Sequence, residues 1–205
     1  HLSSHQSGYY CLSKDNDNFH GAFHPSLPDK DYLTKLIIPV ASPFKVSICG
    51  AGPDVVPVVK MMTDLGWRID ILDHRPEHLA RVESFGANTI HIRAEKVSSS
   101  HFENSDAIVI MSHHLHRDGL FLSAALSSAA TYIGLLGPSG RRDKLLNEKA
   151  LTASDVKGRV YGPIGLDIGG RTPVAIALSI CAQIQEQLTN NLNVQRMKPF
   201  WLEEV

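Results

Sequence analysis

Residues 45–66 read KVSICGAGPDVVPVVKMMTDLG, and the order of features within them indicates the class of fold. The letters KVSICG have the β-branched and apolar character of a buried strand, and the turn GAG follows at 50–52. An amphipathic run comes next, with Pro57 in its first turn, where a missing N–H costs little, and Asp54 placed to cap it. A strand, a glycine turn and a helix in this order predict one βα unit of a parallel sheet.

The glycine turn carries two of the three glycines of the dinucleotide-binding fingerprint G-x-G-x-x-G. Gly50 and Gly52 are present, and Val55 stands in place of the third. In that fingerprint the second glycine admits a pyrophosphate and the third lets the helix pack closely on the strand. Losing the third therefore weakens the expectation of NAD more than that of a phosphate held by backbone N–H groups and the helix dipole. A tight turn without a ligand is the alternative.

Short apolar runs and amphipathic stretches then alternate along the chain. Further strands are predicted over residues 68–73, 88–92, 106–112 and 131–137, and further helices over 76–86, 117–129, 139–151 and 172–188. The last helix has Thr172 as its N-cap and Pro173 as its first residue. Its first half is apolar nearly all round, which predicts burial against the sheet. The pattern predicts an α/β fold: a Rossmann-like, doubly wound parallel sheet with helices on both faces.

Three segments are expected. Residues 1–44 carry prolines and polar clusters without sustained periodicity, so they read as an irregular N-terminal segment, either a linker or the remnant of a truncated N-terminal domain. Residues 45–190 form the Rossmann-like domain, and residues 191–205 a C-terminal tail. No run approaches the roughly 18 consecutive apolar residues that a membrane span needs, and no signal-peptide pattern opens the chain, so a cytoplasmic protein without a membrane partner is expected.

The net charge and the spacing of the cysteines argue against several kinds of partner and site. A formal net charge of −1 over 205 residues argues against nucleic acid as the main partner. Cys11, Cys49 and Cys181 are odd in number and widely spaced, which fits neither a disulfide framework nor a C-x-x-C metal site. Structural thiols are therefore expected.

Asp73 ends the second predicted strand. It lies about 20 residues after the glycine turn, where a carboxylate that binds ribose stands in nicotinamide-dependent enzymes. Arg75, two residues later, is suited instead to a phosphate. The choice of cofactor stays open at this position.

The run SHHLHRD, residues 112–118, follows the fourth predicted strand, on the sheet edge where ligands bind in such folds. Its closely spaced histidines suggest a metal, but no carboxylate or cysteine stands with them at ligand spacing, so no metal is expected. Direct contact with a ligand is expected of His113 and Asp118. A polar loop without a ligand is the alternative.

A second glycine-rich turn precedes the helix predicted at 139–151. Gly137 makes its backbone pliable, and Ser139 offers a hydroxyl. Arg141 and Arg142 place two cations in the first helical turn, where they oppose the helix dipole unless an anion stands between them. An anion site is expected here, with solvated surface arginines as the alternative.

The stretch GPIGLDIGGRTP, residues 162–173, holds a single carboxylate, Asp167, in a pliable backbone. One acid beside flexible backbone suits recognition of an amino-bearing ring edge. A structural turn in which Asp167 caps local N–H groups is the alternative.

Taken in order, five stretches resemble the C-terminal Rossmann domain of the XdhC/CoxI family, the accessory proteins of xanthine dehydrogenase and carbon monoxide dehydrogenase. They are ICGAG, GWRIDILDHR, MSHHLHRD, YIGLLGPSGRRDKLL and PIGLDIGGRTPVAIALSICAQI. The resemblance runs from about Lys45 to about Gln187. It implies a non-catalytic chaperone that binds molybdenum cofactor (molybdopterin carrying molybdenum), assists its sulfuration and inserts it into an apo-enzyme.

The same resemblance implies ligand and partners. The cofactor is a pterin with a dithiolene and a phosphate, and by resemblance its phosphate would be held by Gly50, Gly52, Ser139, Arg141 and Arg142. The rest of the cleft would be lined by His113, Asp118 and Asp167. The implied partners are an apo molybdenum hydroxylase and, unless this protein performs the sulfuration itself, a cysteine desulfurase. A dimer is expected on separate grounds, because the domain is small and has apolar helices.

Two other functions remain open on the residues alone. An NAD(P)-binding oxidoreductase is favoured by Gly50, Gly52 and Asp73, but no lysine or tyrosine stands at the spacing that hydride transfer needs. A degenerate nucleotide-binding regulatory module, whose role is contact with other proteins, is the third reading.

Overall fold

The computed structural model describes residues 8–15, 18–25, 35–40 and 42–191, and the chain divides into two units, residues 1–43 and 44–205. Apart from Asn191, the tail predicted over residues 191–205 lies outside the described residues.

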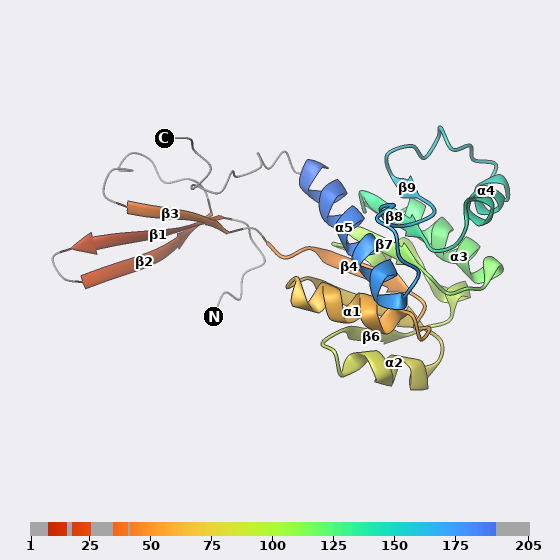
Figure 1. Cartoon of the computed structure of the whole chain (residues 1–205), viewed down its shortest axis with the longest axis horizontal. Helices are drawn as coiled ribbons and strands as arrows, with labels where there is room; N and C mark the ends of the chain where they lie inside the picture. Colours follow the sequence, from red (N-terminus) through yellow and green to blue (C-terminus); the bar gives the residue numbers. More distant parts are fainter. Residues whose placement is uncertain (1–7, 16–17, 26–34, 41, 192–205) are drawn as a thin grey trace. The chain divides into compact units, whose positions relative to one another are not determined.

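The first unit holds a three-stranded antiparallel sheet (Figure 1). Its strands are β1 (Gly8–Asp15), β2 (Asn18–His24) and β3 (Lys35–Val40), with β1 in the middle. The prediction of an irregular segment is therefore wrong for these residues. The sheet pairs positions as far apart as Gly8 and Val40, and strand formation that depends on such distant partners leaves little local periodicity.

The second unit is built on a six-stranded sheet whose neighbouring strands all run parallel. Its strands are β4 (Lys45–Cys49), β5 (Arg68–Asp73), β6 (Asn88–His91), β7 (Ala107–Ile110), β8 (Tyr132–Leu135) and β9 (Val160–Tyr161). Their order is β6-β5-β4-β7-β8-β9, which confirms the Rossmann-like sheet. The sequence did not predict β9, because two residues are too short for a periodic signal.

Five α-helices and two short 3₁₀ helices are described in this unit. They are α1 (Val55–Asp64), α2 (Pro76–Glu83), η1 (Ala94–Lys96), η2 (Ser99–Phe102), α3 (Leu115–Leu126), α4 (Ser139–Asn147) and α5 (Pro173–Asn191). One core cluster joins α1, α2 and α5 to the sheet, and the other joins α3 and α4 to the opposite face. In β7, Val109 faces the first cluster and Ile108 the second. Helices on both faces are thus confirmed.

The predicted N-cap is present in α5 but not in α1. The Thr172 hydroxyl accepts a hydrogen bond of 3.2 Å from the N–H of Ala175, as an N-cap does. Asp54 makes no such bond, because its backbone already has helical angles, φ −77° and ψ −11°, instead of the extended conformation of a capping residue. The prediction that Asp54 caps α1 is wrong.

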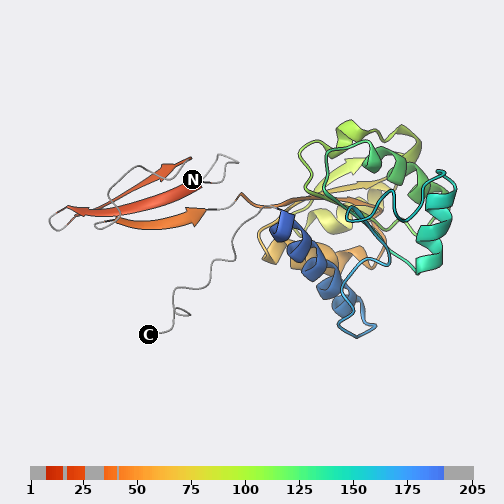
Figure 2. The same cartoon turned by 90° about the horizontal axis from the view of Figure 1, so that it is seen from above.

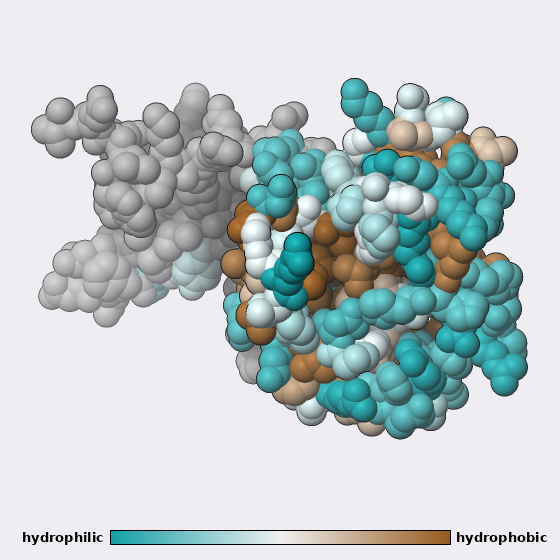
Figure 3. Space-filling view, turned by 45° about the vertical axis from the view of Figure 1, so that its right-hand side comes forward, coloured by the Kyte–Doolittle hydropathy of each residue, from teal (hydrophilic) through white to brown (hydrophobic). Residues whose placement is uncertain are grey.

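The first half of α5 is buried on one side only. Figures 1 and 2 show α5 lying beside α1 on one face of the sheet, where Ala177 and Ile180 are fully buried. The predicted burial against the sheet is thus confirmed for one side of the helix, whereas Val174 and Leu178 are 61% and 50% exposed. A helix in an outer layer has a single face toward the sheet. Figure 3 shows hydrophobic surface between hydrophilic residues on the side of the second unit that it draws.

The architecture places one crevice at a defined position. After β4 the chain turns into α1 on one face, and after the neighbouring β7 it turns into α3 on the other. The carboxyl ends of two such strands form the topological switch point, where open α/β sheets bind ligands. No helix in the described part of the chain has both the length and the hydrophobicity of a membrane span.

Candidate functional site

The turn after β4 forms the floor of the crevice. Gly50 has φ 109°, and a Cβ atom there would lie 2.7 Å from the Cα of Ser112 in the loop after β7. Glycine is therefore required both by the backbone conformation and by the approach of the second loop. The N–H of Gly52 has no hydrogen-bond acceptor among the described residues, which leaves a donor for a ligand at the start of α1.

Asp73, at the end of β5, is buried and fully engaged by its neighbours. Its Oδ2 accepts hydrogen bonds from the N–H of Ala51 at 2.7 Å and from Arg75 Nη2 at 2.8 Å. Its Oδ1 accepts from the N–H and Nε of Arg75 at 2.9 and 3.0 Å, and His74 Nδ1 lies 3.1 Å away. A carboxylate offers about four acceptor sites. Asp73 thus fixes the glycine turn to the end of β5.

These contacts determine the ionisation of Asp73. Burial alone would raise the pKa of its carboxyl group, but hydrogen bonds from the Arg75 side chain and from the N–H groups of Ala51 and Arg75 outweigh it. Together with the charge of Arg75 they hold the pKa of Asp73 well below its ordinary range. The same pair raises the pKa of Arg75. Arg75, predicted to take a phosphate, is thus committed to Asp73.

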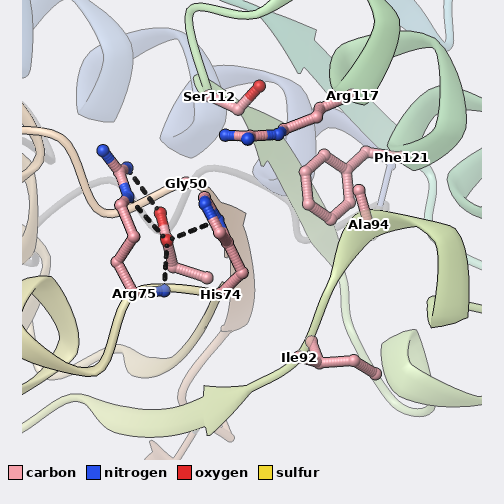
Figure 4. Close-up of a pocket in the computed structure, with 9 residues that line it drawn as sticks. Gly50, His74, Arg75, Ile92, Ala94, Ser112, Arg117 and Phe121 are labelled. Carbon is pink, nitrogen blue, oxygen red and sulfur yellow. Dashed lines mark hydrogen bonds and ion pairs between the residues drawn. The ribbon is translucent and has the colours of Figure 1, made fainter.

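A pocket opens beside the glycine turn, between the carboxyl ends of β5 and β7 (Figure 4). Arg117, in the first turn of α3, lies across it from His74, and Phe121 and Ile92 supply an apolar side. Arg117 forms no hydrogen bond or ion pair with any described residue. The pocket therefore combines an uncommitted guanidinium with apolar surface.

Asp118, in the first turn of α3, connects Ser112 in the loop after β7 to Arg141 in the first turn of α4. It is 1% exposed, and its Oδ2 accepts hydrogen bonds from Arg141 Nε at 3.0 Å and Nη2 at 2.5 Å. The hydroxyl of Ser112 donates to its Oδ1 in a short bond. The anion expected beside Arg141 is thus supplied by the chain itself.

Because Gly137 has no side chain, the Arg141 side chain has room to reach Asp118. The φ of Gly137 is 125°, and a Cβ atom there would lie 2.7 Å from Cδ of Arg141. Arg142 is held elsewhere, by Asp143 at 2.7 Å and by the carbonyl of Gly162 at 2.8 Å.

Ser139, the first residue of α4, is exposed, and its hydroxyl makes no hydrogen bond with a described residue. Of the three side chains predicted to bind an anion at this turn, those of Ser139, Arg141 and Arg142, that of Ser139 alone has no partner among the described residues.

His113 contacts the other side of the glycine turn. Its Nε2 lies 2.8 Å from Oδ2 of Asp54, across the crevice, and its φ of 60° is unusual for a residue other than glycine. The other oxygen of Asp54 is buried without a partner among the described residues. His113 therefore ties the loop after β7 to the start of α1.

Asp167 stands apart from these residues. It is exposed in the loop between β9 and α5 and makes no hydrogen bond or ion pair with any described residue. No contact brings it to the crevice.

Sequence reasoning missed Arg117, Ser112, His74 and Phe121 as pocket residues. The signal for Arg117 was present, since it adjoins Asp118 in the run SHHLHRD. Consecutive residues of a helix project at different angles, so Arg117 points in another direction than the buried Asp118. The sequence does not say whether that direction leads into the pocket.

The described residues give the crevice neither a reactive thiol nor a metal-binding group. Burial, followed by the charge of Asp118, raises the pKa of the Cys49 thiol well above its ordinary value, and burial raises the pKa of Cys181 to about 12. Both are therefore neutral thiols with little nucleophilic character. Among residues 8–15, 18–25, 35–40 and 42–191, no group of three His, Cys, Asp or Glu side chains is placed to hold a metal ion.

The model of the XdhC Rossmann domain matches residues 46–184. The chain belongs to the XdhC family. A relative in Bacillus subtilis (strain 168), named as a probable subunit of xanthine dehydrogenase, is 31% identical over 161 residues, which are 77% of this chain and 47% of that protein. This XdhC-family chain thus spans about half the length of the curated relative that it matches.

The fold of this XdhC-family chain is also similar to a solved structure. A crystal structure of a xanthine dehydrogenase from Bacillus halodurans matches it with a TM-score of 0.69 at 21% identity, over 92% of this chain and 64% of that one. A match over 92% of 205 residues is longer than residues 44–205 alone, so it extends into the first unit. At this identity the likeness concerns the fold.

Proposed function

We propose that this protein is an accessory factor for a molybdenum hydroxylase of the xanthine dehydrogenase type, and that it binds molybdenum cofactor in the crevice at the switch point. The observation that carries the proposal is the pocket between β5 and β7, where Arg117 faces the glycine turn without a protein partner among the described residues. Membership of the XdhC family supports the identity of the ligand.

The residues of the crevice fit the phosphate end of that cofactor. A phosphate needs N–H donors and a cation, and the free N–H of Gly52, the start of α1 and the guanidinium of Arg117 provide them. The apolar side formed by Phe121 and Ile92 suits a flat ring. The cofactor supplies molybdenum chemistry to its client enzyme, and these residues hold and orient it.

In this proposal the phosphate lies at Arg117 and not at Arg141 or Arg142. Arg141 already neutralises the buried carboxylate of Asp118, and withdrawing it would leave that charge unpaired. Arg142 is held by Asp143 and by a backbone carbonyl. Asp167 has no place in the proposed site, because no contact with a described residue connects it to the crevice.

NAD(P) is the second candidate ligand, favoured by the order of the strands. The carboxylate that would bind its ribose is Asp73, which is 3% exposed and receives four hydrogen bonds from Ala51 and Arg75. Little acceptor capacity is left for ribose hydroxyl groups. The geometry therefore supports a phosphate ligand without the usual ribose contact.

The proposed partners follow from the same reading. An apo molybdenum hydroxylase would receive the cofactor, because two similar proteins carry xanthine dehydrogenase in their names. A cysteine desulfurase would supply sulfur for sulfuration, and a dimer is the proposed assembly. A carrier must release its ligand, which favours a few charge-assisted bonds over deep burial.

Co-purification tests the binding step. The full chain is produced in a host that makes molybdenum cofactor, and the released ligand is oxidised and measured as fluorescent pterin beside nicotinamide absorbance. We expect pterin at a substantial fraction of the wild-type protein and much less in Arg117→Ala. Arg81→Ala is the matched control, since Arg81 is exposed on α2 and its side chain has no partner among the described residues. Nicotinamide without pterin would contradict the proposal.

The accessory role has its own test. A strain that lacks the protein is expected to lose molybdenum hydroxylase activity and to regain it with the wild type and with Arg81→Ala, but only weakly with Arg117→Ala. Full hydroxylase activity in the deletion strain would contradict an accessory role.

A further inference from the structure

His74 occupies a position in the pocket that the proposed function leaves unexplained. It follows Asp73 at the end of β5, and its side chain is 31% exposed. It lines the pocket together with Gly50, Ser112 and Arg117 (Figure 4). An anion held by Arg117 and the glycine turn would therefore lie close to the imidazole ring.

The two nitrogens of this ring have different surroundings. Nδ1 lies 3.1 Å from Oδ1 of Asp73, so the tautomer that this contact favours carries its proton on Nδ1. Nε2 has no partner among the described residues. In the neutral ring Nε2 is thus an acceptor, which cannot bond an anion until it binds a proton.

Charged groups from several elements face His74. Asp73 and Arg75 flank it in sequence, Arg117 approaches from α3 and Glu95 from η1. His91, on β6, places Nε2 3.0 Å from the backbone carbonyl oxygen of His74. Because Arg75 is already paired with Asp73, Arg117 is the cation of this set that no described carboxylate neutralises.

These surroundings favour the neutral ring while the pocket is free of anions. Burial lowers the pKa of His74, and the charges of Arg117 and Arg75 lower it further, while those of Asp73 and Glu95 oppose the shift. A bound anion would add negative charge beside the ring and offset Arg117. Binding then favours the protonated ring.

We propose that His74 takes up a proton when an anionic group binds beside Arg117 and Gly50, and that the affinity of the site for that group rises as the pH falls. The inference rests on the proposed function, because it concerns the regulation of the same site. It gives a carrier of a phosphate-bearing ligand a way to hold its cargo at lower pH and to release it at higher pH.

Linkage fixes the direction of the effect. Affinity is highest below the titration midpoint of His74 in the free protein and lowest above its midpoint in the complex. Each pH unit that separates the two midpoints is a tenfold difference in affinity between the two limits. Above both midpoints His74 adds no pH dependence.

The experiment follows the titration of His74 in the full chain by NMR, with the signal assigned from its loss in His74→Gln. Sulfate is the probe, since its charge is constant in the neutral range and its own ionisation cannot imitate the effect. Sodium chloride at equal ionic strength controls for screening. We expect sulfate, but not chloride, to move the His74 midpoint upward.

Three variants show whether the shift depends on Arg117 and His74 or is a general effect of salt. In Arg117→Ala the midpoint should be higher without sulfate, because a repelling cation is lost, and sulfate should move it much less. Arg81→Ala should behave as the wild type. In His74→Gln, sulfate binding read from the Gly52 amide signal should lose its pH dependence. A His74 midpoint that sulfate leaves unchanged would overturn the proposal.

Failure of the His74 proposal can be told apart from failure of the proposed function. Co-purified pterin without a sulfate-induced shift overturns the role of His74 and leaves the cofactor proposal standing. A sulfate-induced shift without co-purified pterin supports the anion site and counts against molybdenum cofactor as its ligand.

Discussion

Asp118 connects the loop after β7 to the first turn of α4. Its carboxylate is buried, and its partners are Ser112 in that loop and Arg141 in α4. An ion pair of this kind contributes little compared with an apolar replacement, but removing one partner is costly because the other charge stays buried.

Asp118→Asn is therefore expected to lower the free energy of unfolding by roughly 2–3 kcal/mol, somewhat below the cost for a fully buried pair because Arg141 retains some exposure. Asp143→Asn is the matched control, since Asp143 is 52% exposed and pairs with Arg142 at the surface. Its effect should stay within about 0.5 kcal/mol. Urea unfolding measures both, and equal losses in the two variants would show that Asp118 is not the stronger link.

Gly50 sets the distance between the glycine turn and the loop after β7. With φ 109° and a Cβ position 2.7 Å from the Cα of Ser112, Gly50→Ala forces backbone to move on one side or the other. We expect a loss of more than about 2 kcal/mol in the free energy of unfolding, together with weaker ligand binding.

Gly140→Ala is the control for Gly50→Ala. Gly140 lies in the first turn of α4, and a Cβ atom there meets nothing within 4 Å. Alanine should leave stability unchanged or raise it by up to about 1 kcal/mol. If Gly50→Ala were as stable as Gly140→Ala in urea unfolding, the close approach to Ser112 would not matter.

Asp73 contributes stability that depends on pH. Its carboxyl pKa is lower in the folded protein than in the unfolded chain, where it is about 3.9. The contribution is thus fully present above that value and is lost as the pH falls toward the folded-state pKa. Between about pH 5 and pH 2 the free energy of unfolding should fall less steeply in Asp73→Asn than in the wild type. Parallel curves in acid unfolding experiments would contradict this assignment.

At the scale of elements, α5 shows that apolar residues of one helix can differ widely in burial. Leu188 is 3% exposed in the core cluster shared with α1, whereas Leu178, on the same helix, is 50% exposed. Leu188→Ala should cost about 2–5 kcal/mol and Leu178→Ala less than about 1 kcal/mol. Thermal unfolding followed by circular dichroism compares them, and equal costs would mean that the outer side of α5 is covered as well as the inner one.

The elements of the second unit could be predicted because their signals are local. RIDILD matches β5 in full, and Pro76 begins α2 as expected, since proline and glycine punctuate such a chain clearly. The strand β3 could not, because it pairs with β1 across positions as far apart as Gly8 and Val40. The strand β9 could not, because two residues are too short for a periodic signal. Which side of α5 is exposed could not be predicted, because composition does not say which face meets the sheet.

The sequence predicted which two loops meet at the crevice, but not how their side chains pair. The glycine turn and the run at 112–118 meet at the switch point, as strand order alone requires. The pairing of Arg141 with Asp118 could not be read from sequence, because it depends on how a side chain crosses Gly137. For the same reason the sequence did not indicate that Arg117, one residue from a predicted contact, has no partner among the described residues.

At the scale of the whole molecule, the two units differ in what they contribute. Both core clusters of the second unit consist of residues from that unit itself, between Phe44 and Leu188. The pocket is likewise formed by one sheet and its helices, so the residues proposed to bind the ligand all lie within residues 50–121. The proposed binding of molybdenum cofactor therefore belongs to the Rossmann unit.

The affinity of purified molybdenum cofactor for the wild type, Arg117→Ala and Arg81→Ala, measured by anaerobic equilibrium dialysis, tests this binding site most directly. Loss of one charge-assisted contact of about 1.5–3 kcal/mol should weaken binding by Arg117→Ala about 10- to 100-fold, while Arg81→Ala binds as the wild type does. Equal affinity in Arg117→Ala and the wild type would place the cofactor elsewhere. A wild-type protein that does not bind the cofactor at all would contradict the proposed function.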